Sequence, residues 1–259
     1  MEPSPLISCL MTTGNNPLLT TRAVLCYQAQ NWKNKELVVV DNGGHDLTPI
    51  LEDIPDKGYR YFRCPEKKGI HPGELINYGL DRANGQFIIH WNENDWHHPH
   101  RISLQMSVFD TSISISWLSG TLLHMDNPEL VHHPYADLTR NGYFASMIHR
   151  NNPGIRFPER GKKAEYQFIS KWDDKEVKIA NPELYWLIVR TMTGGIRERR
   201  RFLSGIRKNT GDIAWLAWLK LRGRNILSHP RFTLQDDARR SFQRYFQESQ
   251  KLGLITSVG

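Results

Sequence analysis

The feature that most constrains this chain is an uninterrupted apolar run, Leu37-Val38-Val39-Val40, which ends abruptly in Asp41-Asn42-Gly43-Gly44. A β-branched run without polar alternation is typical of a strand that is buried on both faces, as in a parallel sheet covered by helices. Other short apolar runs alternate with amphipathic stretches along the first ~110 residues, which predicts an α/β fold. The expected strands are 6–11, 37–40, 59–63 and 87–91, and the expected helices are 17–30, 73–83 and 99–110.

The remainder of the chain has a different pattern. Two stretches alternate as antiparallel strands do, and they are followed by a short helix, another strand and a helical, basic tail. The expected strands are 112–124, 142–149 and 184–190, and the expected helices are 163–171, 213–221 and 232–252. The second half is therefore predicted to be α+β, with a helical extension beyond Gly195.

The charge of the chain is unevenly distributed. The formal net charge is +7, and thirteen lysines and arginines lie between residues 196 and 244. Such a surface is either a solvated helical face or a contact for a polyanion, such as nucleic acid, anionic lipid or a phosphorylated ligand. Both interpretations stay open at this stage.

The cysteines and the N-terminus favour a cytosolic setting. Cys9, Cys26 and Cys64 are odd in number and have no paired spacing, which predicts reduced thiols. The first five residues show neither the basic start nor the apolar stretch of a signal peptide.

The segment Ile213 to Leu221 contains Trp215 and Trp218 and is followed by Arg222 and Arg224. Tryptophans beside basic residues are typical of a helix that lies on a membrane surface. The apolar residues are distributed nearly all round the helix, however, which favours an ordinary helix packed on the main domain.

Polar clusters follow three of the expected strands. They are Thr12 to Asn15, Asp41 to Gly43 and Asn92 to Asp95. In an open α/β sheet, ligands bind beyond the carboxyl ends of the strands. Any one of these clusters is an ordinary polar turn, but three at successive strand ends indicate a binding site.

These same segments resemble the family-2 glycosyltransferases. Residues 6–15 (LISCLMTTGN) resemble the opening strand of that family, and residues 23–44 (AVLCYQAQNWKNKELVVVDNGG) resemble its second strand and turn. Residues 77–95 (NYGLDRANGQFIIHWNEND) and the following His98-Pro99-His100-Arg101 resemble its N-x-G and H-P-x-R segments. The likeness continues weakly at residues 164–168 (AEYQF) and 184–190 (LYWLIVR).

The resemblance implies a GT-A fold, a Rossmann-type nucleotide-binding sheet, and transfer of a sugar from a nucleoside-diphosphate sugar with inversion. A UDP-sugar is the expected donor. The resemblance assigns Glu165 as the base that takes a proton from the acceptor. The residues that it implies for donor binding are Thr13, Asn15, Asp41, Asn42, Asn77, Asn92 and Asn94.

The chain departs from the family at the metal-binding motif. Asn92 and Asn94 stand where the family has the two aspartates of D-x-D, and an amide is a poorer ligand for Mn²⁺ or Mg²⁺ than a carboxylate. A shifted motif, Glu93 and Asp95, remains as the predicted metal pair. Three interpretations stay open: an enzyme that depends weakly on metal, an enzyme with a shifted motif, and a non-catalytic module that binds a nucleotide sugar or a polyanion.

We therefore expect a nucleotide-sugar-binding half at residues 1–111, an acceptor half with the catalytic group at 112–194 and a basic helical extension at 195–259. The acceptor is expected to be a surface glycan, a lipid-linked saccharide or a modified base in DNA. The basic tail leaves open a peripheral contact with an anionic surface, such as a membrane.

Overall fold

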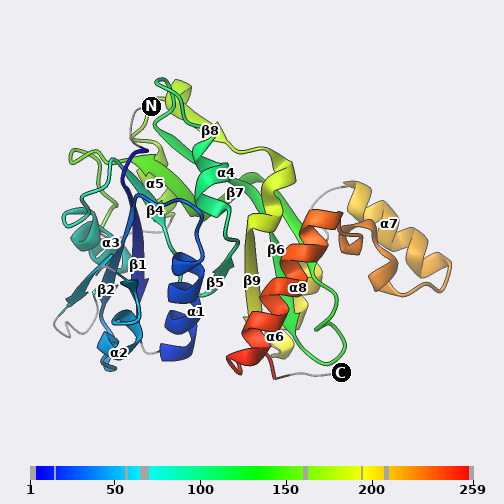
Figure 1. Cartoon of the computed structure of the whole chain (residues 1–259). Coiled ribbons are helices and arrows are strands. Elements are labelled where there is room, and N and C mark those ends of the chain that lie inside the picture. The colour runs from blue at the N-terminus through cyan, green and yellow to red at the C-terminus, as the bar shows by residue number, and fades with distance from the viewer. Residues whose placement is uncertain are drawn as a thin grey trace. The chain divides into compact units, whose positions relative to one another are not determined.

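The computed structural model describes most of the chain, and its elements fall into two compact units (Figure 1). The first unit comprises residues 1–118 and 143–180, and the second comprises 119–142 and 181–259. Among the described residues, none of the helices is both long enough and apolar enough to cross a membrane. The described residues are 4–14, 16–55, 58–64, 70–159, 163–193, 195–206 and 210–256.

The first unit is built on four parallel strands in the order β3-β2-β1-β4. The strands are β1 (Ile7–Thr13), β2 (Lys35–Asp41), β3 (Tyr59–Arg63) and β4 (Phe87–His90). The helices of this unit are α1 (Pro17–Gln28), α2 (Thr48–Leu51), α3 (Pro72–Leu80), α4 (Arg101–Met106) and α5 (Ala164–Ile169). The predicted α/β architecture of the first half is therefore confirmed.

Burial on both faces of the sheet explains why β2 is apolar from Leu37 to Val40. Leu10, Val38 and Val40 project from one face of the sheet and pack with Leu75 and Leu80 of α3. The intervening residues point to the opposite face, because successive side chains alternate along a strand. Figure 1 shows β1 and β2 between α3 and α1. Helices cover both faces, so most of these side chains are apolar, and the buried polar pair Ser8 and Glu36 is joined by a hydrogen bond of 2.5 Å.

Antiparallel and short strands extend this sheet. The C-terminal part of β7 (Tyr135–Arg150) pairs antiparallel with β4, and β6 (Ile115–Asp126) follows β7 in the sheet. The short strand β8 (Val177–Ile179) pairs with the start of β6, directly after the 3₁₀ helix Asp174–Glu176. The three-residue strand β5 (Asp95–His97) follows the loop after β4. The C-terminal residues of β7 therefore lie directly beside β4.

The second unit contains the ends of β6 and the beginning of β7, joined by β9 (Ile188–Thr193), which pairs parallel with β6. Its helices are α6 (Ile196–Ser204), α7 (Thr210–Leu221) and α8 (Asp236–Lys251), and its 3₁₀ segments are Pro182–Leu187, Ile226–Ser228 and Pro230–Phe232. Tyr135, Phe202 and Ile206 form part of its core. The helical tail expected beyond Gly195 is confirmed.

A buried hydrogen-bonded chain fixes α8 in this unit. His124 Nδ1 lies 2.8 Å from the Tyr245 hydroxyl, which lies 2.7 Å from Thr191 Oγ1. The second nitrogen, His124 Nε2, lies 2.8 Å from the carbonyl oxygen of Val131 and donates to it. A carbonyl oxygen can only accept, so the contact with Val131 places a proton on Nε2. These hydrogen bonds tie α8 to β6 and β9.

Two sequence-based assignments are wrong in part. Residues 184–187, predicted as the start of a strand, belong to a 3₁₀ helix, and the strand begins at Ile188. The helix α7 was expected to be packed as an ordinary helix, but Ile213, Trp215, Trp218 and Leu221 are exposed. The helix is therefore packed on one side only.

Candidate functional site

The carboxyl ends of β1 and β2 bring two predicted donor-binding residues together. Thr13 and Asp41 are the last residues of their strands and are direct partners in the parallel register. Asp41 is buried, and its Oδ1 accepts from the backbone N–H of Gly43 at 2.7 Å. Its Oδ2 accepts from the Tyr61 hydroxyl at 2.7 Å. Burial, together with the hydrogen bond to Asp41, raises the pKa of Tyr61 to about 12, so the phenol stays protonated as the donor.

Glu93 lies under the first strand end rather than facing open solvent. Its Oε2 accepts from Thr13 Oγ1 at 2.5 Å and from Thr20 Oγ1 at 3.1 Å. Burial raises the pKa of Glu93, while these hydroxyls and the backbone N–H of Gly14 act in the opposite direction. The carboxylate therefore connects β1, α1 and the loop after β4, and its hydrogen-bonding capacity is largely used within the fold.

The loop after β4 is closed by amide groups. Asn92 Oδ1 accepts from the backbone N–H of Asn94 at 3.1 Å, which forms a tight turn. Asn92 Nδ2 lies 3.2 Å from Asp95 Oδ2 and donates to it. The hydroxyl of Tyr143, on β7, donates to the same oxygen at 2.7 Å. Asp95 Oδ2 thus accepts two hydrogen bonds within the fold, and it is one of the two carboxylate oxygens that could bind a metal ion.

Two buried arginines support this loop from beneath. Arg101 Nη1 lies 2.7 Å from His97 Nδ1, and a guanidinium can only donate, so His97 Nδ1 accepts. The proton of the neutral imidazole is then on Nε2, which donates to the Asn92 carbonyl at 3.0 Å. Arg22 Nη2 donates to the Asn94 carbonyl at 2.9 Å.

These arginines set the electrostatics of the loop. Burial lowers the pKa of Arg101 to about 10, so the group remains a cation at neutral pH. Burial and the neighbouring Arg101 charge also hold the pKa of His97 well below its usual value, which agrees with a neutral ring. The two guanidinium charges of Arg22 and Arg101 therefore offset the carboxylates of Glu93 and Asp95, and the amides at 92 and 94 add no further negative charge to the loop.

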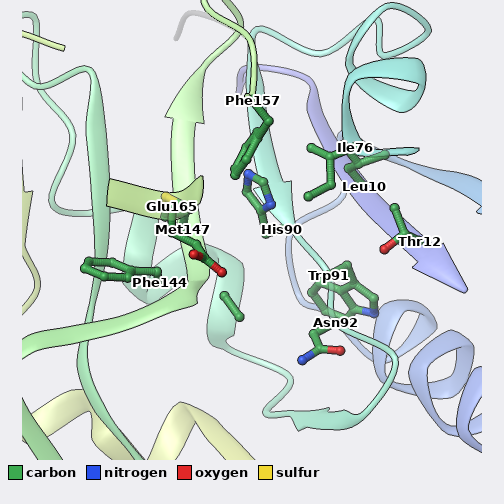
Figure 2. Close-up of a pocket in the computed structure, with 11 residues that line it drawn as sticks. Leu10, Thr12, Ile76, His90, Trp91, Asn92, Phe144, Met147, Phe157 and Glu165 are labelled. Carbon is green, nitrogen blue, oxygen red and sulfur yellow. The ribbon is translucent and has the colours of Figure 1, made fainter. Parts of the chain in front are cut away.

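A cavity of about 160 Å³ is lined by residues from the end of β4 and from α5 (Figure 2). Asn92 and Glu165 both line it, although they are far apart in sequence. Figure 2 shows the Glu165 carboxylate pointing toward the cavity, which Thr12 and Asn92 also border. Its apolar wall is formed by Leu10, Ile76, Trp91, Phe144, Ala145, Met147 and Phe157, and His90 lies among them. An exposed carboxylate beside an apolar wall and an amide can position and deprotonate a hydroxyl group.

Asn77 is placed differently from the other predicted donor-binding residues. Its Nδ2 donates to the Phe157 carbonyl at 2.9 Å, and its Oδ1 accepts from the Phe157 N–H at 2.8 Å. Both ends of the amide therefore hold the segment that carries Phe157 against α3. Asn42 lies beside Thr13, to whose carbonyl its backbone N–H donates at 3.2 Å. Asn15 lies outside the described residues.

The two residues of the predicted metal pair, Glu93 and Asp95, have different hydrogen-bond partners. Glu93 faces the hydroxyls of α1 and β1, whereas Asp95 faces Tyr143 and Asn92. Across the part of the chain that the structure describes, no group of three or more His, Cys, Asp or Glu side chains is arranged to hold a metal ion. The donor set around Asn92 to Asp95 fits a resident dication poorly, and the Glu93 and Asp95 pair stays a prediction.

Three supporting residues were not identified from the sequence. Tyr143 comes from β7, and no spacing rule connects it to Asp95. Arg22 lies within α1, where an arginine is expected on a solvated face. Arg101 belongs to the His98-Pro99-x-Arg101 segment that resembles the family, so a role for it was open to prediction from that resemblance.

The strand order, the parallel register and the polar loops at the strand ends define the GT-A class of α/β fold. The chain matches the model of glycosyl transferase family 2 over residues 8–158, which is more than half of its length. The chain therefore belongs to glycosyl transferase family 2, as the sequence resemblance indicated.

Curated relatives agree with this assignment. The chain is 32% identical over 95 residues to an uncharacterised glycosyltransferase of Haemophilus influenzae, covering 36% of this chain and 37% of that protein. It is 30% identical over 95 residues to the GalNAc(5)-diNAcBac-PP-undecaprenol beta-1,3-glucosyltransferase of Campylobacter jejuni, covering 35% of this chain and 30% of that protein. The chain matches only about a third of the length of these relatives.

Solved structures show the same fold at low identity. The mannosyltransferase PcManGT of Pyrobaculum calidifontis, solved with GDP-Man and Mn²⁺, has a TM-score of 0.55 at 14% identity, covering 96% of this chain and 76% of that one. TarS 1–349 of S. aureus, solved with UDP-GlcNAc, has a TM-score of 0.54 at 17% identity, covering 78% of this chain and 64% of that one. These likenesses confirm the expected GT-A-like fold.

Proposed function

We propose that this family-2 glycosyltransferase transfers a sugar from a UDP-sugar to a glycan or lipid-linked acceptor, with inversion at the anomeric carbon. The observation that carries the proposal is that Glu165 of α5 and Asn92 at the end of β4 line one cavity. The donor would lie along the ends of β1 and β2, at Thr13, Asp41 and Asn42. The UDP-GlcNAc with which TarS was solved supports a UDP-sugar as donor.

In this proposal Glu165 is the general base. The acceptor hydroxyl transfers its proton to the Glu165 carboxylate as its oxygen attacks the anomeric carbon. The bond between that carbon and the diphosphate oxygen breaks, and the nucleoside diphosphate leaves with the electron pair. In this proposal a bound acceptor covers the exposed Glu165 carboxylate and, together with the apolar wall of the cavity, keeps water from the anomeric carbon.

We also propose that turnover by this chain depends on a divalent metal less than turnover by an enzyme whose site is built around Mn²⁺. Mn²⁺ is the ion with which PcManGT was solved. The leaving diphosphate carries negative charge that must be stabilised. Neutral amides at Asn92 and Asn94 repel a diphosphate less than carboxylates do, and the buried Arg22 and Arg101 offset the charges of Glu93 and Asp95. Amide N–H groups also donate directly to phosphate oxygens.

The acceptor class rests on the relatives. The name of the Campylobacter jejuni relative describes an undecaprenol-linked saccharide as acceptor, which supports a lipid-linked or glycan acceptor here. None of the named relatives supports a DNA acceptor, and the family match does not favour the non-catalytic binding module.

The decisive test is the variant Glu165→Gln, which is nearly isosteric and removes the base. We expect UDP-sugar affinity, measured by calorimetry, to stay unchanged while transfer to a saccharide acceptor falls by about a hundredfold or more. Gln167→Ala, an exposed neighbour on the same helix, is the matched control and should keep wild-type turnover. Wild-type turnover in Glu165→Gln would overturn the role of Glu165, and UDP-sugar binding by the wild type without any turnover would favour the binding module.

A further inference from the structure

The helix α7 presents a continuous apolar face to solvent. Ile213 is 54% exposed, Trp218 is 46% exposed and Leu221 is 87% exposed. Trp215 is also exposed, and its ring lies edge-on to that of Trp218 with centroids 5.3 Å apart. Large side chains exposed together in this way mark an interaction surface rather than ordinary scattered exposure.

Helical geometry separates this face from the packed side. Asp212 and Leu219 are buried, and Leu216 packs against the core of the second unit. These residues follow one another at helical spacing, so they form a single inward stripe. Ala214 and Ala217 are exposed beside Ile213, Trp215, Trp218 and Leu221, which fill the outward arc. The sequence of α7 is apolar on nearly all sides because one side packs against the core of the second unit and the other side is exposed to solvent.

The exposed charges of α7 and of the three residues that follow it are all positive. Asp212 is the one acidic residue between 210 and 224, and both of its oxygens accept from Arg231, at 2.9 Å and 2.8 Å. The exposed charged residues of the same stretch are Lys220, Arg222 and Arg224. The outward apolar face is therefore bordered by cations, with its single carboxylate turned inward and neutralised.

We propose that α7 docks on the surface of an anionic lipid bilayer, with Trp215, Trp218 and Leu221 in the interface and the three cations at the headgroups. Tryptophan is favoured at the boundary between water and hydrocarbon, and lysine and arginine near anionic lipid add attraction. The twelve-residue helix is too short to span a bilayer but suits a position parallel to its plane. The positive charge beside the apolar face is complementary to anionic lipid headgroups. The one acidic residue of this stretch, Asp212, is buried, so the stretch offers no exposed carboxylate to a protein partner.

The test is flotation of the full chain with vesicles made of equal parts phosphatidylcholine and phosphatidylglycerol, and with vesicles of phosphatidylcholine alone. We expect the wild-type chain to float with the anionic vesicles and to bind the neutral ones at least about twentyfold more weakly. The double variant Trp215→Ala with Trp218→Ala should remain at the bottom of the gradient. Arg222→Glu with Arg224→Glu should weaken binding to the anionic vesicles by a similar factor.

Matched variants control for general loss of apolar area and of charge. Leu18→Ala with Leu25→Ala removes two exposed leucines of α1, and Arg239→Glu with Arg240→Glu reverses two exposed charges of α8. Both controls should float like the wild type, with circular dichroism verifying that every variant is folded. Failure of the wild type to float, or normal flotation of the tryptophan variant, overturns the proposal. So does a dimer that dissociates in the tryptophan variant, because a second copy would then cover the face.

Discussion

At position 92, an amide in place of a carboxylate changes the partners that Asp95 can have in this site. The amide of Asn92 donates to Asp95 Oδ2, a contact that an aspartate at position 92 would replace with repulsion between two carboxylates. The Tyr143 hydroxyl and the Arg101 charge reinforce the present arrangement. At this position Asn92 and Tyr143 donate to Asp95 Oδ2 within the fold, and we propose that these hydrogen bonds take the place of a metal ion.

The double variant Asn92→Asp with Asn94→Asp should therefore be less stable than the wild type without metal. Added Mn²⁺ should raise its melting temperature clearly, because the new carboxylates supply ligands for a dication. Differential scanning fluorimetry with and without Mn²⁺ measures both effects. Asn152→Asp is the control, since Asn152 forms a similar exposed turn by accepting from Gly154 N–H at 2.9 Å. An equal response of the double variant and the wild type to Mn²⁺ would contradict this role of the two amides.

His149 predicts a dependence of stability on pH. Burial lowers its pKa from 6.5 to about 4, and its ring lies among aromatic side chains, 5.1 Å from Phe168 and 5.7 Å from Trp172. Between these two values the unfolded chain binds a proton that the folded chain does not, so stability falls as the pH is lowered. The loss amounts to about 3 kcal/mol of unfolding free energy for this group.

His149→Phe keeps an aromatic ring and removes the titration, so its unfolding free energy should fall less steeply from pH 6.5 to pH 4. Urea titrations at several pH values give the slope. His45→Phe, at an exposed position, should keep the wild-type slope. If His149→Phe also kept that slope, the histidine would not be neutral in the folded protein.

At the scale of elements, the packing of α3 against residues 157 and 158 positions Phe157, which forms part of the cavity wall. A Cβ added at Gly73 would lie 2.3 Å from the carbonyl oxygen of Pro158, a main-chain atom with little freedom to move. One turn further along, Asn77 clamps the backbone of Phe157. The close approach at Gly73 and the clamp together hold Phe157 against the cavity.

Gly73→Ala should lower the unfolding free energy by about 1–3 kcal/mol, since the main chain at Pro158 must shift to admit the methyl group. Chemical denaturation measures this change. Gly195→Ala is the matched control, because an added Cβ there meets no described atom within 4 Å and the backbone φ is negative. Equal stability of the two variants would show that the segment at Pro158 adapts freely.

Most elements of the first half were predictable, because the longer helices have a clear period and the strands β1, β2 and β4 are mostly apolar. Residues 184–187 were not, since a short apolar run does not distinguish a strand from a helical segment. The cap at Asn181, whose side chain accepts from Glu183 N–H at 3.0 Å, was the available signal for a helical start. The short elements α2 and β5 have too few residues to establish a pattern.

The strand-end residues of the site were predictable from the sheet, whereas Glu165 of α5 was predicted from the family resemblance alone. Thr13, Asp41 and Asn92 follow predicted strands, so a parallel sheet brings them to one edge. Tyr143 reaches Asp95 through an antiparallel return that sequence spacing does not encode. The engagement of Asn77 with the backbone was likewise hidden, because an amide suits a phosphate and a peptide group equally well.

For the molecule as a whole, the sequence and the structure assign the fold and the family, whereas donor, acceptor and metal dependence are proposals. The division into a donor half at 1–111, an acceptor half at 112–194 and a basic extension beyond 195 stays a prediction. The first unit alone contains the strand ends, the loop from Asn92 to Asp95 and Glu165, which are the parts that the proposed reaction needs.

The most direct test of the central claim is the release of UDP from a panel of UDP-sugars by the EDTA-treated wild-type chain, with a saccharide acceptor present. We predict turnover of at least one UDP-sugar in EDTA, with a modest increase on adding Mn²⁺, because amides and buried arginines replace the metal ligands of D-x-D. Complete loss of turnover in EDTA, restored by Mn²⁺, would contradict this claim and favour a metal site at Glu93 and Asp95.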